Sequence, residues 1–114
     1  DIGHLIDRHQ QNLSVGEKKR VAIAAVLAME PQVLLLDEPT AGMSKDETQY
    51  AVDLIRRLTE GKTVVIIEHD MEVVFSLADR ITVLHLGTIL ASGPPDEIRE
   101  NQAVKDAYLG DMEE

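Results

Sequence analysis

The feature that most constrains this fold is a set of three short apolar runs that alternate with segments of helical periodicity. The runs are Val33 to Leu36, Val64 to Ile67 and Ile81 to Leu84. Continuous runs of Val, Ile and Leu without polar alternation are typical of parallel strands that are buried on both faces. We therefore expect an α/β fold with a mostly parallel sheet and crossover helices.

Helices are predicted before and between these strands. Glu17 to Met29 is apolar nearly all round after Arg20, which predicts a helix buried on several sides. Lys45 to Leu58 has apolar residues on one face at helical spacing, and Met71 to Leu77 predicts a shorter helix.

Two capping boxes mark helix starts. Ser14 is followed at the third position by Glu17, and Ser44 is followed in the same way by Glu47. In such a box the serine side chain accepts from the glutamate N–H, and the glutamate side chain accepts from the serine N–H. Both helices should therefore begin at a defined residue.

The last third of the chain predicts short elements. His85 to Thr88 is typical of a turn and Ile89 to Ala91 of a strand. Two short helices are expected after the Gly-Pro-Pro break, near Asp96 to Glu100 and over Ala103 to Tyr108. The acidic tail from residue 110 onward is expected to fray.

Composition limits the possible classes of protein. The net charge is −10, from 21 acidic and 11 basic residues, which disfavours nucleic-acid binding because it repels phosphate backbones. The chain has no cysteine, so disulfides and thiolate metal sites are excluded. Its 114 residues suit one domain with a modest core.

Two carboxylates, Asp37 and Glu38, follow the apolar run Val33 to Leu36 directly. At the carboxyl end of a parallel strand, side chains project into the crevice where ligands bind. An aspartate there can hold Mg²⁺ through its water shell, and a neighbouring glutamate can orient or deprotonate an attacking water. This is the Walker B pattern of nucleotide hydrolases; the alternative is an ordinary strand end with a polar turn.

Two further motifs are weaker when each is taken alone. The loop Leu13 to Glu17 combines a helix cap with Gly16, which lets a ligand approach the backbone at a helix start that attracts anions. The alternative is a simple capping box. His69 follows a buried strand and could donate to a phosphate oxygen, although a lone histidine there is more often structural.

The order and spacing of the three motifs resemble ATP-binding cassette (ABC) ATPases from about Leu13 to the C-terminus. Leu13 to Glu17 resembles the family signature loop, and Asp37 and Glu38 resemble the Walker B aspartate and the catalytic glutamate. Ala41 to Ser44 resembles the loop that contacts the opposite subunit, and His69 resembles the switch histidine.

This resemblance implies a mechanism in which two cassettes pair head to tail around ATP and Mg²⁺. Ser14 and the Gly16 backbone would contact the γ-phosphate of the partner's ATP. Asp37 would hold the Mg²⁺ water shell, Glu38 would polarise the attacking water, and His69 would contact the γ-phosphate on its own side. Closure and opening of the pair would drive the membrane subunits.

The sequence departs from the family pattern at three positions. Val15 stands where the family often has Gly, and Glu17 where it often has Gln. Ser44 stands where many members have Asp, which puts the cross-subunit contact in doubt, although the capping role is retained.

The largest departure is that no G-x-x-x-x-G-K-[ST] motif, the Walker A phosphate cradle, occurs in the sequence. We therefore expect a single partial domain, the C-terminal half of a P-loop NTPase core. In it, residues 1–29 hold the signature loop and the end of the helical subdomain. Residues 30–93 hold the core from Walker B to the switch histidine, and residues 94–114 the final helices and acidic tail.

Three functions remain open from the sequence. The chain is either part of a working ATPase motor or a non-enzymatic piece that supplies only its signature loop in trans. A nucleic-acid-binding regulator is the disfavoured third class. We expect the isolated chain to be inactive because Walker A is missing.

Several strings resemble the branched-chain amino-acid uptake subgroup, and closely similar urea-uptake cassettes share them. They are Ala41 to Ser44, Glu68 to Met71, Val83 to His85, Ala91 to Gly93 and Ala107 to Gly110. The resemblance implies a second ATPase subunit and transmembrane permeases as partners, with a solute-binding protein acting indirectly. It also implies a cytoplasmic location, peripheral on the inner face of the membrane.

Overall fold

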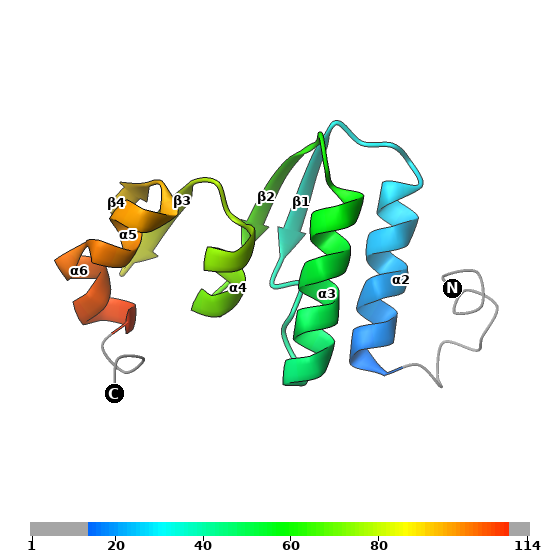
Figure 1. Ribbon diagram of the computed structural model, residues 1–114, viewed down its shortest axis with the longest axis horizontal. Coiled ribbons are helices and arrows are strands. Elements are labelled where there is room, and N and C mark those ends of the chain that lie inside the picture. Colours follow the sequence, from blue (N-terminus) through cyan, green and yellow to red (C-terminus); the bar gives the residue numbers. More distant parts are fainter. Residues whose placement is uncertain (1–13, 110–114) are drawn as a thin grey trace. The chain divides into compact units, whose positions relative to one another are not determined.

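The computed structural model describes residues 14–109, so Leu13 and the acidic tail from Gly110 lie outside the described residues. The chain divides into two compact units, one ending at His69 and the other beginning at Asp70. Figure 1 shows the elements of each unit. No helix within residues 14–109 is long and apolar enough to cross a membrane.

The first unit contains two helices and a pair of parallel strands. Strand β1 (Val33–Asp37) pairs in parallel with β2 (Thr63–Ile67), with Val33 opposite Thr63 and Asp37 opposite Ile67. The helices α2 (Val15–Leu27) and α3 (Lys45–Leu58) lie side by side (Figure 1). The parallel pairing confirms the α/β prediction for these two strands, and it places the carboxyl ends of β1 and β2 next to each other.

The two faces of the β1–β2 pair differ in burial. Leu34 is buried, whereas the residues of the opposite face are exposed, with exposed fractions from 49% to 64%: Val33, Leu35, Val65 and Ile67. The prediction of strands covered on both faces is therefore wrong for the described residues. The physical reason is that the helices of this unit form one layer only, and a continuous apolar run does not show how many layers cover it.

Helix α3 contributes most of the buried surface of the first unit. It buries four residues at helical spacing: Ala51, Val52, Leu54 and Ile55. It also begins and ends where the sequence predicted. Helix α2 differs from its prediction, because it begins at Val15 and buries only Gly16 and Ile23. An apolar helix on the margin of a small layer has too few neighbours to bury all its sides.

The second unit contains a β-hairpin and short helices. They are α4 (Met71–Leu77), β3 (Ile81–His85), β4 (Thr88–Gly93), α5 (Pro95–Glu100), α6 (Gln102–Val104) and the π-helix η2 (Lys105–Leu109). Its core is built around Ile81, Ile98 and Val104, with Phe75 packed against them. Helix α4 has its predicted bounds, and Asp70 caps it by accepting from the N–H groups of Glu72 and Val73.

Strand β3 does not join β1 and β2 in a parallel sheet, as its apolar run suggested. It pairs antiparallel with β4. The cause lies in the turn between them, where Leu86 and Gly87 have φ values of 50° and 80°. Two consecutive residues with positive φ form the type of two-residue turn that joins adjacent antiparallel strands, whereas parallel strands need a long crossover.

Candidate functional site

Glu38 occupies a constrained backbone position immediately after β1. Its φ is 46°, in the left-handed region that costs a non-glycine residue energy and that is common at functional sites. The Glu38 N–H donates to the Ile67 carbonyl at 2.7 Å, which extends the strand pairing by one residue. Its carbonyl accepts from Lys19 Nζ at 2.9 Å. Hydrogen bonds from two elements therefore hold Glu38 in this conformation.

The side chains of Glu38 and His69 meet at the carboxyl ends of the two strands. His69 Nδ1 lies 3.2 Å from Glu38 Oε1. The exposed fractions are 73% for the His69 side chain and 52% for that of Glu38, so both remain open to a ligand. The structure thus brings two of the predicted site residues together, and the reason is that β1 and β2 are parallel neighbours.

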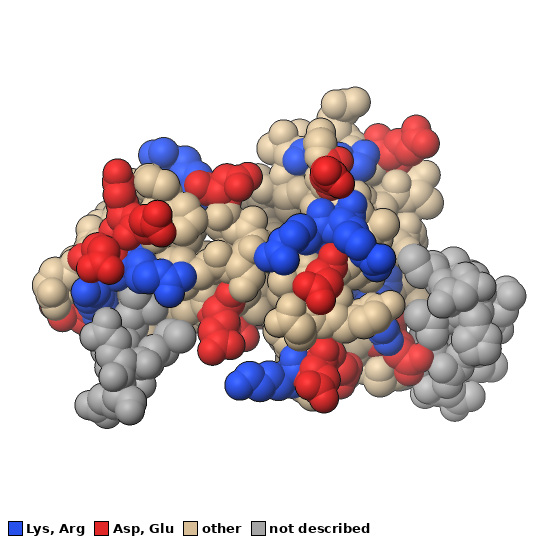
Figure 2. Space-filling view, viewed as in Figure 1, with Lys and Arg blue, Asp and Glu red and all other residues tan. Residues whose placement is uncertain are grey.

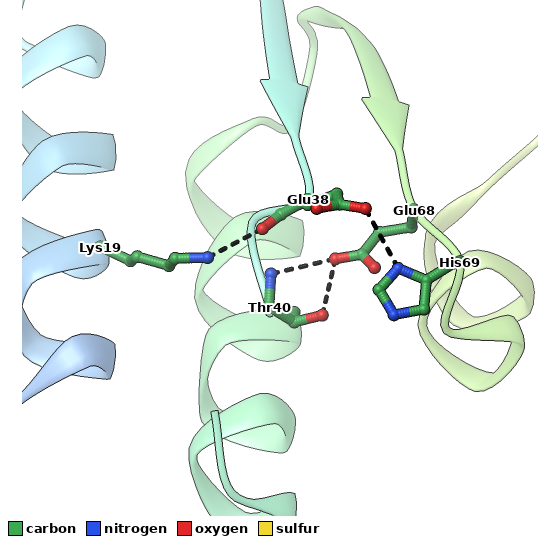
Figure 3. A network of polar contacts seen from close by, with 5 residues as sticks. All are labelled: Lys19, Glu38, Thr40, Glu68 and His69. Carbon is green, nitrogen blue, oxygen red and sulfur yellow. Dashed lines mark hydrogen bonds and ion pairs between the residues drawn. The ribbon is translucent and has the colours of Figure 1, made fainter. Parts of the chain in front are cut away.

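A second polar pair lies beside the first. Glu68 Oε1 accepts from the Thr40 N–H at 3.0 Å and from Thr40 Oγ1 at 2.6 Å. Thr40 is buried, with 6% of its surface exposed, and Glu68 Oε2 is buried with no hydrogen-bond partner. Figure 3 shows both pairs together with Lys19.

Sequence reasoning assigned no role to Lys19, Thr40 or Glu68. Glu68 carried one usable signal, since a carboxylate that ends an apolar strand directly before His69 needs a polar partner. Nothing in the sequence identified Thr40 as that partner, because the two residues are 28 positions apart.

The signature-like loop lies at the start of α2. Ser14 Oγ accepts from the Glu17 N–H at 3.1 Å, and Glu17 Oε1 accepts from the Ser14 N–H at 3.2 Å. This confirms the first capping box. Gly16 is buried, and the side chain of Glu47 lies so close that a Cβ on Gly16 would be 2.0 Å from Glu47 Oε2.

Only half of the second capping box is formed. Ser44 Oγ accepts from the Glu47 N–H at 3.2 Å and caps α3, as predicted. The Glu47 carboxylate does not complete the box, because it lies against Gly16 instead. The glutamate therefore links the start of α3 to the signature-like loop.

The loop that contains Ser44 also approaches the start of α2. Gly42 has a φ of 78°, and a Cβ on it would lie 3.4 Å from Val15 Cγ1. The predicted signature residues and the predicted inter-subunit loop are thus neighbours within one unit. Val15, a departure from the family pattern, lies at their contact.

The residues present fit a Mg²⁺ ion that is bound mainly by water and phosphate. Within residues 14–109 there is no group of three or more His, Asp or Glu side chains that could hold a metal ion by itself. Mg²⁺ commonly uses one or two carboxylates and takes its other ligands from water and nucleotide phosphates. Asp37, exposed at the end of β1, suits this arrangement.

The charged side chains of the described residues are mixed in sign. On the face drawn in Figure 2, Lys and Arg side chains lie interspersed with Asp and Glu. Such mixing does not create the single-sign field that steers a polyanion toward a protein.

Sequence comparisons match the two ends of the chain to known families. The profile of the ABC transporter family matches residues 1–41, and that of the branched-chain amino acid ATP-binding cassette transporter family matches residues 88–114. The high-affinity branched-chain amino acid transport ATP-binding protein LivG of Salmonella typhimurium is 43% identical over 107 residues. The energy-coupling factor transporter ATP-binding protein EcfA2 of Methanospirillum hungatei is 48% identical over 104 residues.

The alignments cover most of this chain but a minor part of each relative. They include 92% of the chain and 42% of LivG, and 90% of the chain and 26% of EcfA2. The chain therefore spans less than half the length of the curated relatives that it matches.

Solved structures agree with the sequence matches. The ADP conformation of MJ1267, an ATP-binding cassette of an ABC transporter, has a TM-score of 0.78 and 29% identity to this chain. That match covers 94% of this chain and 44% of the other. Together, the motifs, the fold and these matches identify the chain as a member of the ABC transporter ATP-binding family, and its residues 88–114 match the branched-chain amino acid cassette family.

Proposed function

We propose that the chain is part of the ATP-hydrolysing motor subunit of an ABC importer. The observation that carries this proposal is the contact of 3.2 Å between Glu38 and His69 at the carboxyl ends of two parallel strands. A carboxylate there is placed to polarise a water, and an imidazole beside it is placed to donate to a phosphate oxygen. Catalysis of phosphoryl transfer requires mainly this kind of positioning.

The remaining residues would complete the site around ATP. Bound Mg²⁺ would neutralise charge on the phosphates, and Asp37 would hold its water shell. At the start of α2, the four described signature residues from Ser14 to Glu17 would face the γ-phosphate of the partner's ATP, with Leu13 preceding them. Ser44, at the start of α3, would lie at the contact between the two subunits.

The relatives are named as ATP-binding proteins of transport systems, and these names suggest the partners. We propose a second ATPase subunit and transmembrane permeases, with a solute-binding protein acting indirectly. The chain would then lie on the cytoplasmic side of the membrane and attach to it through the permeases. Nucleic acid is not among the proposed partners.

Branched-chain amino acids are the solute class that the comparisons favour. The support is the match of residues 88–114 to the branched-chain amino acid cassette family and the similarity to LivG. Tyr108 donates to the Leu84 carbonyl, and its ring meets His85 edge-on at 5.6 Å between centroids. Two strings that carried the subgroup resemblance are thus in contact. A urea or amide importer remains the alternative, since its cassettes share these strings.

A second candidate is that the 114-residue chain acts without hydrolysing ATP, by supplying its signature loop in trans. Two observations favour it. The sequence has no glycine-rich phosphate cradle, and the apolar face of β1 and β2 is exposed. An exposed apolar face favours association with another polypeptide segment.

Calorimetry with Mg-ATP, run beside a phosphate-release assay, separates these candidates. We expect no binding and no turnover from the chain alone. When it is joined to an N-terminal half that carries a Walker A motif, we expect turnover that Glu38→Gln abolishes and that Glu60→Gln, in an exposed turn, leaves unchanged. Turnover that survives Glu38→Gln would refute the role of Glu38. Hydrolysis by the chain alone would refute its expected inactivity.

A further inference from the structure

The contact between Glu38 and His69 is too weak to fix the positions of the two side chains by itself. Both side chains are more than half exposed, and a contact between exposed polar side chains contributes little to stability. Two mobile side chains with so weak an attraction would separate readily. The two backbone segments from which they project must therefore be fixed by other interactions. The bond from the Glu38 N–H to the Ile67 carbonyl is one of these, and it fixes the backbone at Glu38.

The pair Thr40–Glu68 has the properties of such an interaction. Thr40 lies two residues after Glu38, and Glu68 lies one residue before His69. One carboxylate oxygen accepts both the N–H and the hydroxyl of Thr40, at 3.0 Å and 2.6 Å. These bonds are partly buried, and hydrogen bonds to a charged group are stronger than exposed ion pairs.

We propose that Glu68 and Thr40 form a clamp that positions Glu38 against His69. The clamp ties the segment after β1 to the end of β2, so the two projecting side chains keep their separation of 3.2 Å. In the network drawn in Figure 3, Glu68 forms its hydrogen bonds with Thr40 and none with these two side chains. It is therefore a positioning residue. The role of the clamp in ATP hydrolysis rests on the proposed function, whereas the geometry of the clamp does not.

The second carboxylate oxygen of Glu68 takes no part in the clamp. Oε2 is buried without a hydrogen-bond partner, so both bonds of the clamp use Oε1. Glutamine retains an acceptor at the Oε1 position, but it removes the charge and puts an amide NH₂ where Oε2 stands. Glu68→Gln should therefore keep both bonds of the clamp in weaker form, whereas Glu68→Ala removes them and leaves the buried Thr40 donors unsatisfied.

The test uses isotope-labelled chain and two magnetic-resonance measurements that need no nucleotide. The first is the hydrogen-exchange rate of the Thr40 amide, which reports the clamp itself. The second is the ¹⁵N chemical shift of His69 Nδ1, which reports its contact with Glu38. The variants are Glu68→Ala, the conservative Glu68→Gln, and Glu60→Ala as a control at an exposed acidic residue of the same unit.

We expect Glu68→Ala to speed Thr40 exchange about thirtyfold, the factor that the two lost hydrogen bonds produce together, and to shift the His69 Nδ1 signal. Glu68→Gln should bring both values part of the way back toward those of the unchanged chain, and Glu60→Ala should change neither. An unchanged His69 signal together with faster Thr40 exchange would overturn the proposal, because the pair would then be structural only.

If Glu68→Ala does not fold, Thr40→Val decides the question. This variant keeps the shape of the side chain and the N–H bond but removes the hydroxyl bond. A shift of the His69 signal supports the clamp, and no shift overturns it. Since neither readout involves ATP, a failed ATPase assay would count against the proposed function and would leave the clamp untouched.

Discussion

Glu38 is predicted to hold its position at a cost in stability, and two substitutions at this one residue measure that cost. Its φ of 46° lies in the left-handed region, which costs most residues about 1–2 kcal/mol. Asparagine tolerates this region, whereas alanine does not. Both substitutions remove the carboxylate and its exposed contact with His69, so the contact cancels when the two variants are compared.

We expect Glu38→Asn to be more stable than Glu38→Ala by about 0.5–1 kcal/mol, the part of the strain that asparagine relieves. For a chain of 114 residues the difference corresponds to roughly 2–4 °C in unfolding temperature. Urea unfolding followed at amide signals of β1 and α3 reads the first unit by itself. Equal stability of the two variants would refute the claim that Glu38 is strained. Both variants should lack turnover in the complete cassette.

Three further substitutions test local features of the structure. Ser14→Ala removes the cap of α2 and should cost about 1 kcal/mol, seen as lost helicity by circular dichroism; unchanged helicity would contradict the capping role. Leu86→Asn should stabilise the hairpin by about 0.5–1 kcal/mol, because Leu86 is 90% exposed and Asn-Gly suits its turn. Slower hydrogen exchange of the β3 amides would confirm this, and faster exchange would count against it. Tyr108→Phe loses the bond to the Leu84 carbonyl and should destabilise the second unit by about 0.5–1 kcal/mol in thermal unfolding, whereas an unaltered transition would show that the bond contributes nothing.

The helices α3 and α4 could be predicted to the residue because local chemistry fixes their starts. Ser44 and Asp70 both cap the helix that follows, and each cap depends on residues within three positions. The strands were harder. The run from Ile81 to Leu84 has the composition of the other two strands, but its partner is decided by the turn at Leu86 and Gly87. The sequence predicted a turn over His85 to Thr88, but leucine does not suggest a positive φ. The sequence therefore did not reveal that this turn is of the two-residue type that joins antiparallel strands.

The residues of the candidate site also fall into those that the sequence predicts and those that it does not. Glu38 and His69 could be found because each follows an apolar run, and the structure brings the two residues together. Thr40 and Lys19 could not be found, because their contacts join distant parts of the chain. The sequence also did not reveal that Leu35 and Val65 are exposed. Apolar character indicates a preference for burial, but it does not show whether another layer covers the residue.

Lys19 connects the two halves of the proposed mechanism within one unit. It lies on α2, whose first turn would face the partner's ATP, and its Nζ donates to the carbonyl of Glu38, which would serve the ATP on its own side. The same carbonyl accepts from the Ala41 N–H, which leads into the loop before Ser44. A shift of α2 would therefore reach the strained residue Glu38 through this hydrogen bond. Because that residue is held by hydrogen bonds on both its N–H and its carbonyl, a small change in either can alter where its carboxylate points.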